Sequence, residues 1–221
     1  MAVQTNIRLP SRKRFPVRRV PRPLPVRGRD TASAWNSIKI LPIRFRQLGS
    51  ASSPVQRQTQ VKAAWDWNQL YFQFRCESPD VEPLFTRRDS PLFQEECVEI
   101  FLRVPGRKDF WEFQGNSGSV IYDAHVPRPE ASRLWRRWCR WVAIHTRFKA
   151  TIERGKSWQA TWAIAWHDLA IEPRVGMMLE TRLCRVADDG FLSQQELSSW
   201  PPAKRSFEEP KTWGALEMLE P

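Results

Sequence analysis

Bulky apolar side chains recur at every second position in two stretches of the chain, residues 70–76 and 158–166. Because successive side chains of a β-strand point to opposite faces, this period predicts two half-buried strands. A third run, residues 97–102, is apolar except for one acidic side chain, Glu99. A charge held on a sheet needs water, a partner or a ligand, so Glu99 is the first candidate functional residue.

Shorter apolar runs continue this pattern and are separated by residues that favour turns. The predicted turns include residues 66–68 and 115–118, which are rich in Asp, Asn, Gly and Ser. Short strands at this spacing predict an all-β fold, an antiparallel β-sandwich of the immunoglobulin-like or jelly-roll type. The additional strands are expected at 61–65, 110–114, 119–122, 144–152 and 178–186, with a broken strand over 38–45.

One segment, residues 133–141, has helical rather than strand periodicity. Leu134, Trp138 and Trp141 fall on one side of a helix, and arginines occupy the opposite side. A basic amphipathic helix of this kind suits an acidic membrane surface. We favour the simpler interpretation, a short basic crossover helix whose tryptophans pack on the sandwich.

The beginning of the chain is basic and rich in proline. Nine Lys and Arg residues and no acid lie within residues 1–29, which leaves +2 of the net charge of +11 for the rest of the chain. Five prolines between positions 10 and 25 exclude a helix there and a central strand. We therefore expect residues 1–14 to be a basic flexible tail, with the proline-rich stretch extended along a sheet edge, and residues 15–221 to form one domain. Nucleic-acid binding is not expected, since the basic charge is confined to this end.

Composition narrows the class of protein further. Twelve Trp and twelve Phe in 221 residues supply a core that folds without metal or disulfide help. The four cysteines contain no C-x-x-C pair and are expected to be small buried residues, and the three histidines lie far apart in sequence, so zinc is not expected. No run of 18 apolar residues and no secretory signal are visible, which on sequence alone predicts a cytoplasmic protein without a transmembrane segment.

Taken in order, the motifs resemble those of the family 9 carbohydrate-binding modules over about residues 15–221. The ordered set, rather than any one motif, is specific. It comprises Gly28-Arg29-Asp30 with Trp35, Val61–Asp66, Arg88-Asp89-Ser90, Glu95–Leu102, Trp111-Glu112-Phe113, Ala163–Trp166, Ser199-Trp200-Pro201, and Phe207 with Pro210 and Trp213-Gly214.

The resemblance implies a non-catalytic module of polysaccharide breakdown that holds a sugar or glycan end between two aromatic side chains. Carried over by position, the aromatic walls are Phe93 and Phe207, where the sugar-binding members have tryptophan, and the polar residues are Glu99, Gln114 and Asn116. Gln114 replaces a family arginine, which removes a charge-assisted hydrogen bond. The resemblance therefore implies weaker affinity or a changed ligand.

Each of these residues also has a structural interpretation. Phe93 and Phe207 would then be core residues, Glu99 would pair with Arg75 or Arg103 across neighbouring strands, and Gln114 and Asn116 would shape a turn.

The resemblance also implies structural calcium, for which Asp80, Asp89, Asp109 and Asp123 are candidate oxygen ligands, and a family that is usually secreted.

Two other functions remain open from the residues. The carboxylates Glu95, Glu96, Glu99, Glu112 and Asp123 lie in one region, and a glycosidase needs a carboxylate pair. Glu95 and Glu96 are adjacent in a predicted loop and are expected to face solvent. The third hypothesis is a basic scaffold in which the tail and the arginines of residues 133–140 bind polyanions. The leading hypothesis, a carbohydrate-binding module, also has a variant: an accessory domain of polysaccharide breakdown whose sugar site is degenerate.

Overall fold

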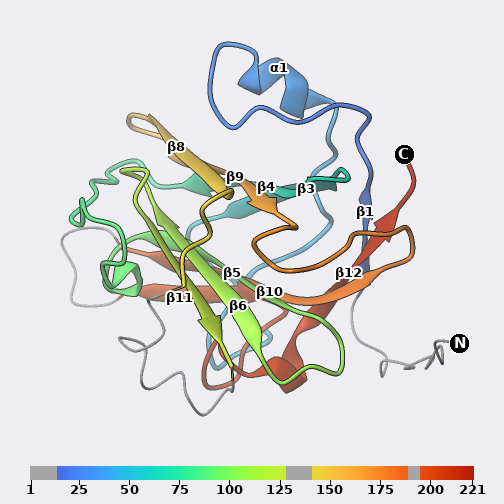
Figure 1. The fold of residues 1–221 in the computed structure, drawn as a ribbon. Helices are drawn as coiled ribbons and strands as arrows, with labels where there is room; N and C mark the ends of the chain where they lie inside the picture. Colours follow the sequence, from blue (N-terminus) through green and yellow to red (C-terminus); the bar gives the residue numbers. More distant parts are fainter. Residues whose placement is uncertain (1–13, 128–140, 189–194) are drawn as a thin grey trace, which may run out of the picture.

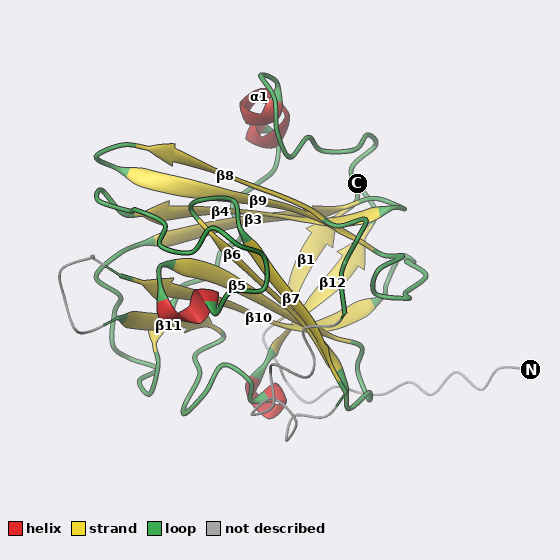
Figure 2. Cartoon of the chain, turned by 60° about the vertical axis from the view of Figure 1, so that its left-hand side comes forward, coloured by secondary structure: helices red, strands yellow, loops and turns green. Residues whose placement is uncertain are grey.

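The computed structural model describes residues 14–127, 141–188 and 195–221. Two β-sheets pack face to face as a sandwich (Figure 1). Figure 2 separates the layers, with the four-stranded sheet above the larger sheet. The fold class predicted from the strand spacing is therefore confirmed.

The larger sheet has eight strands in the order β1-β12-β10-β5-β6-β7, with β11 pairing with β10 and β2 pairing with β11. Its pairs are antiparallel except β1 with β12, which is parallel. The smaller sheet has the order β3-β4-β9-β8. The strands are β1 (Arg14–Arg18), β2 (Arg46–Gln47), β3 (Thr59–Trp65), β4 (Gln69–Glu77), β5 (Cys97–Arg103), β6 (Phe110–Asn116), β7 (Ile121–Val126), β8 (Arg147–Glu153), β9 (Ser157–Ala165), β10 (Met178–Ala187), β11 (Glu196–Trp200) and β12 (Gly214–Leu219). The helical turns are α1 (Thr31–Asn36), η1 (Leu92–Gln94) and η3 (Pro210–Thr212).

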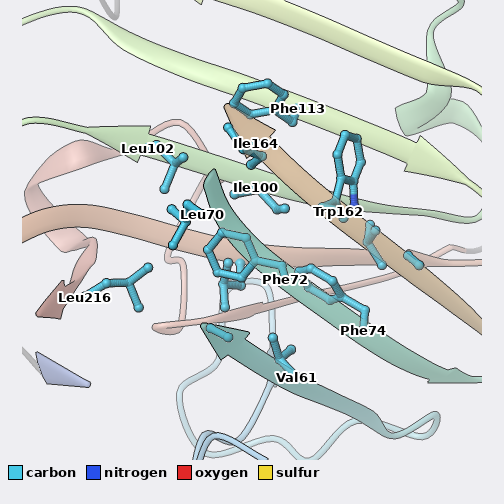
Figure 3. Close-up of a cluster of buried hydrophobic side chains, with 14 of the residues drawn as sticks. Val61, Leu70, Phe72, Phe74, Ile100, Leu102, Phe113, Trp162, Ile164 and Leu216 are labelled. Atoms are coloured by element: carbon cyan, nitrogen blue, oxygen red, sulfur yellow. The ribbon is translucent and has the colours of Figure 1, made fainter. Parts of the chain in front are cut away.

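The main core lies between the two sheets and explains the alternation seen along the strands (Figure 3). Phe72 and Phe74 of β4 and Trp162 of β9 face Ile100 and Phe113 of the larger sheet. The outer face of β4 is buried as well, because Tyr71 packs edge-on against Trp35 of α1.

Gly115 of β6 is required for the close approach of the two sheets. A Cβ atom at this position would lie 2.5 Å from Phe148 Cζ and 2.6 Å from Trp162 Cζ2. Real Cβ contacts are longer, so any side chain here would push β6 away from β8 and β9.

A second apolar cluster covers the face of the larger sheet that points away from the core. Because side chains alternate, Val98, Ile100 and Leu102 of β5 enter the main core while Cys97 and Phe101 belong to this outer cluster. Its other buried members are Leu92, Phe110, Tyr122, Ala124, Val126, Cys184, Val186 and Trp213. The cysteines at 76, 97 and 184 are free and buried, as predicted for small apolar residues.

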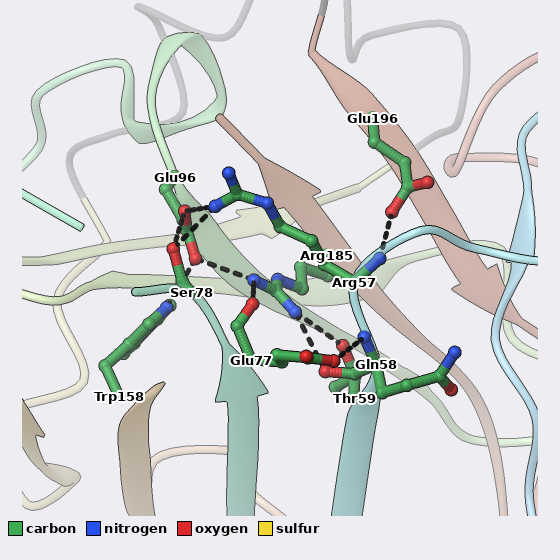
Figure 4. A network of polar contacts seen from close by, with 9 residues as sticks. All are labelled: Arg57, Gln58, Thr59, Glu77, Ser78, Glu96, Trp158, Arg185 and Glu196. Carbon is green, nitrogen blue, oxygen red and sulfur yellow. Dashed lines mark hydrogen bonds and ion pairs between the residues drawn. The ribbon is translucent and has the colours of Figure 1, made fainter. Parts of the chain in front are cut away.

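A buried polar network ties the start of β5 to β10 and β9 (Figure 4). Arg185 of β10, which is fully buried, donates to Glu96 Oε1 at 2.8 Å and to the carbonyl of Gln58 at 3.0 Å. Glu96 also accepts from Trp158 Nε1 at 2.6 Å and Ser78 Oγ at 2.8 Å. The expectation that Glu95 and Glu96 face solvent is wrong: they are 2% and 4% exposed, because both carboxylates satisfy donors inside the fold.

Residues 14–45 and 195–221 differ most from the strands predicted from the sequence. The proline-rich beginning does form an edge strand, since β1 pairs only with β12. The broken strand expected over 38–45 is wrong: this stretch follows helix α1 and makes a single bridge, Ile40 with Lys62. Strands β11 and β12 were not predicted.

The predicted basic helix over 133–141 lies outside the described residues except for Trp141, which packs edge-on against Phe113. Within the described ranges no helix has the length and apolar character needed to span a bilayer.

Candidate functional site

A pocket of about 390 Å³ opens on the outer face of the larger sheet, beside the outer apolar cluster. Four of the five residues predicted for the site line it: Phe93, Glu99, Gln114 and Phe207. The other lining residues are Leu48, Phe101, Glu112, Tyr122, Val126, Val186, Gln195, Leu197, Arg205, Ser206 and Glu208. Sequence positions more than a hundred residues apart therefore meet at one surface.

The two aromatic residues reach the pocket from separate turns. Phe93 belongs to η1, immediately before β5, and is 43% exposed, so the interpretation of Phe93 as a core residue is not supported. Phe207 lies in the loop between β11 and η3 and is partly buried against the outer cluster.

The loop that carries Phe207 is held from below by Arg182 of β10. This fully buried guanidinium donates to the carbonyls of Ser206 at 3.1 Å and Phe207 at 3.2 Å. Trp213 Nε1 donates to the Phe207 carbonyl as well, at 3.0 Å. Arg182 is thus a positioning residue for Phe207. Sequence reasoning missed Arg182, because it does not stand out in a strand that also carries Glu180, Thr181 and Arg185.

The floor of the pocket is polar and comes from adjacent positions of β5 and β6. Glu99 lies opposite Gln114 in the strand register, and Phe101 lies opposite Glu112. Gln114 Nε2 donates to Glu112 Oε1 at 2.6 Å, while Gln114 Oε1 has no hydrogen-bond partner among the described residues. The residues Glu99, Glu112 and Gln114 are 3%, 7% and 4% exposed.

Glu99 does not form either of the ion pairs considered for it. Arg75 pairs with Glu153 on the smaller sheet, and Arg103 pairs with Glu180. The hydrogen bond recorded for Glu99 comes from the thiol of Cys97, with 3.9 Å between Sγ and Oε1. The cross-strand interpretation of Glu99 is therefore wrong.

The two floor carboxylates are strongly perturbed. Burial, reinforced by the negative charges of Glu112 and Glu208, raises the pKa of Glu99 well above its ordinary value. Burial and the charge of Glu208 raise the pKa of Glu112 to about 8, although the hydrogen bond from Gln114 opposes this shift. Both groups therefore tend to keep a proton at neutral pH unless a cation is near.

Asn116 does not line the pocket. Its Nδ2 donates to Glu95 Oε1 at 2.7 Å and to the Phe85 carbonyl at 2.9 Å, and its Oδ1 accepts from Val120 N at 2.8 Å. Glu95 in turn accepts from the backbone of Leu84 at 2.6 Å. Asn116 and Glu95 thus fasten the segment before β5, from which Phe93 projects.

The aspartates considered for calcium are placed differently from one another. Asp109 bonds to Arg107 and His125 and is 17% exposed. Asp89 and Asp123 are neighbours whose charges act on each other, and Asp89 Oδ1 is buried and accepts no hydrogen bond. Asp123 bonds to Arg88 and to the backbone N–H of Ala143.

The fold brings two histidines together that are distant in sequence. The rings of His145 and His167 are 4.7 Å apart, and His145 Nδ1 lies 2.9 Å from Asp168 Oδ1. These three residues form the one group of His, Cys, Asp and Glu side chains with metal-binding spacing in the part of the chain that the structure describes. The sequence-based expectation of no zinc site used the distance between the histidines along the chain. The fold brings two of them together despite that distance.

Comparison with known proteins places this geometry in context. A family model described as "Carbohydrate family 9 binding domain-like" matches residues 27–220. No curated protein sequence matches the chain.

Solved structures share the fold at low sequence identity. A candidate carbohydrate-binding protein from Bacteroides uniformis is 14% identical, with a TM-score of 0.70 over 94% of this chain and 100% of that one. A family 9 carbohydrate-binding module from Caldicellulosiruptor kristjanssonii in complex with glucose is 16% identical, with a TM-score of 0.66 over 95% and 97%. A family 9 module from that organism in complex with cellotriose is also 16% identical, with a TM-score of 0.62 over 95% of this chain and 95% of that one. At these identities the likeness shows the fold.

Proposed function

Because the chain belongs to the carbohydrate family 9 binding domain-like family, we propose that it is a non-catalytic carbohydrate-binding module that holds a sugar or glycan end in the pocket of the larger sheet. The observation that carries this proposal is the meeting of Phe93, Phe207, Glu99 and Gln114 at one pocket. The similar modules from Caldicellulosiruptor kristjanssonii are in complex with glucose and cellotriose, which supports the same class of ligand.

The composition of the pocket matches the surface of a sugar. A pyranose has C–H faces that pack against an aromatic ring, and hydroxyls that must regain the hydrogen bonds they lose from water. Phe93 and Phe207 supply the rings, and Glu99, Glu112 and Gln114 supply the hydrogen-bonding groups. The volume of about 390 Å³ lies at the lower end of the range for ligand pockets, about 300–1,000 Å³, which suits a short ligand or a chain end.

The carboxylates do not favour hydrolysis. Of the five considered for catalysis, Glu95, Glu96 and Asp123 are engaged in structural hydrogen bonds, and Glu99 and Glu112 line the pocket. A glycosidase divides the roles of acid and nucleophile between carboxylates whose pKa values are pushed apart. Here burial raises the pKa of both groups. We therefore expect no turnover of chromogenic glycosides.

Calcium binding is proposed at Asp89 and Asp123. Asp89 Oδ1 accepts no hydrogen bond, its residue has a left-handed backbone (φ 61°), and burial raises the pKa of both aspartates. Carboxylate and carbonyl oxygens are the ligands that Ca²⁺ prefers. When bound, the ion would add to the positive charge that Arg88 supplies to these two carboxylates among the described residues.

Calorimetry against a panel of mono- and oligosaccharides tests the proposed function. Phe93→Ala and Phe207→Ala should each weaken binding about tenfold or more, since a ring–ligand contact is worth about 1 kcal/mol or more. Trp67→Ala is the matched control, because Trp67 is a 52% exposed aromatic that does not line the pocket. A wild-type protein inert toward the whole panel would refute the proposal.

A further inference from the structure

The floor of the pocket carries carboxylates that form no ion pair with a cation of the described residues. Within the described residues, neither Glu99 nor Glu112 has a Lys, Arg or His nitrogen within 4.0 Å. The nearby guanidinium groups are committed elsewhere: Arg103 pairs with Glu180, and Arg182 holds backbone carbonyls of the loop after β11. Arg205 lines the pocket but forms no ion pair with either carboxylate.

The floor of the pocket also has more free hydrogen-bond acceptors than donors among the described residues. One N–H of Gln114 Nε2 donates to Glu112, and the acceptor of the same amide, Oε1, is buried without a partner among the described residues in a side chain that is 4% exposed. Once Glu99 and Glu112 are ionised, the floor presents mainly acceptors: the carboxylate of Glu99, the second oxygen of Glu112 and the amide oxygen of Gln114. A ligand that completes this site must bring donors, and positive charge would also offset the desolvation of the carboxylates.

We propose that the pocket selects a sugar that carries a protonated amine, an amino sugar such as a glucosamine unit, over its neutral counterparts. This inference rests on the proposed function and specifies its ligand. An ammonium group offers three donors and a unit charge, whereas a hydroxyl offers one donor and no charge. A hydrogen bond between an ammonium and a carboxylate is stronger than one in which a neutral hydroxyl donates to the same carboxylate, so the preference should be about tenfold.

Proton release distinguishes this mode of binding from the binding of a neutral sugar. Without a ligand, burial favours protonated Glu99 and Glu112 and raises the pKa of both. The titratable groups around them are Cys97 of β5, Cys184 of β10, Tyr122 of β7, and Arg205 and Glu208 of the loop after β11. An arriving ammonium stabilises the ionised carboxylates, so its binding should release protons and tighten as pH rises, while the amine stays charged.

The test compares three sugars that share one ring: D-glucosamine, N-acetyl-D-glucosamine and D-glucose. Calorimetry in buffers with different ionisation enthalpies measures affinity and proton release together. We expect glucosamine to bind about tenfold more tightly than either neutral sugar. Proton release should accompany glucosamine alone.

Two substitutions address the cause of the preference. Glu99→Gln keeps the shape of the side chain and removes the charge. Gln114→Arg supplies an internal cation for the floor. Either should bring the glucosamine-to-glucose affinity ratio close to one. Glu172→Gln, the same change at an exposed loop position outside the pocket, should retain the wild-type ratio.

The outcomes separate the two proposals. Equal affinity for the three sugars, a preference for a neutral sugar, or binding of glucosamine without proton release overturns the amino-sugar inference. In each of those cases the proposed function stands, because a sugar is bound. Failure to bind any of the three, together with failure across the oligosaccharide panel, refutes the proposed function itself.

Discussion

Substituting Arg185 by methionine should destabilise the fold strongly, because the guanidinium is the centre of the buried network between β10, β5 and β3. Its side chain is fully buried and donates to Glu96 Oε1, to the carbonyls of Gln58 and Glu77, and to Thr59 Oγ1. Methionine preserves much of the volume but provides none of these donors. The change therefore isolates the polar contribution.

The expected loss of unfolding free energy comes from the buried groups that lose Arg185 as their hydrogen-bond partner. Glu96 would remain 4% exposed with the longer contact to Arg57, 3.9 Å from its Oε2, as its remaining ion pair among the described residues, and removing one partner of a buried ion pair costs about 3–5 kcal/mol. The two unbonded carbonyls place the loss toward the upper end of that range. For a chain of this length, 1 kcal/mol corresponds to about 2–4 °C, so the melting temperature should fall by about 6–20 °C.

A double substitution separates the charge from the packing. Arg185→Met with Glu96→Gln removes the unbalanced carboxylate, so it should be more stable than Arg185→Met alone by about 1–3 kcal/mol. Urea titration followed by tryptophan fluorescence measures all the variants. Arg75→Met, at an exposed ion pair with Glu153, should leave the midpoint unchanged. Additive losses from the two buried substitutions would refute this account of the network.

Three further outcomes are expected. Gly115→Ala should cost about 1–3 kcal/mol in urea titrations, because its Cβ would overlap Phe148 and Trp162; wild-type stability would show that β6 can shift without penalty. Stability should fall as pH rises from about 4.5 to 8, because the unfolded chain releases the proton of Glu112 first, and Glu112→Gln should flatten this decline in thermal melts across that range; an unchanged slope would contradict the pKa shift. Calcium should raise the melting temperature of the wild type and not of Asp89→Asn, and an equal response of both proteins would place the ion elsewhere.

The strands that could be predicted are those that place a bulky side chain in the main core at every second position. Residues 70–76 and 158–166 have that pattern because β4 and β9 lie at the centre of the smaller sheet and place alternate rings in the core. The segment after α1 was misjudged, because isoleucines at 38, 40 and 43 suggest a strand, while only Ile40 makes a bridge and is 49% exposed.

Part of the candidate site could also be predicted. The resemblance led to the four residues that line the pocket, but Glu112, Arg182 and Glu208 have no local signal, because their partners lie on other strands and loops. Asn116 is the opposite case. It lies two residues after Gln114, which lines the pocket, yet its own amide forms hydrogen bonds with Glu95 and the backbone instead. Whether the four lining residues bind sugar stays a prediction.

The pocket and the interior of the sandwich lie on the two opposite faces of strands β5 and β6. Glu99 and Gln114 alternate with Ile100 and Phe113, so ligand chemistry and folding are encoded at interleaved positions. A library that varies only Glu99, Glu112 and Gln114 could therefore retarget recognition on an intact scaffold. The same separation would let natural specificity drift between neutral and charged glycans while the protein keeps its shape.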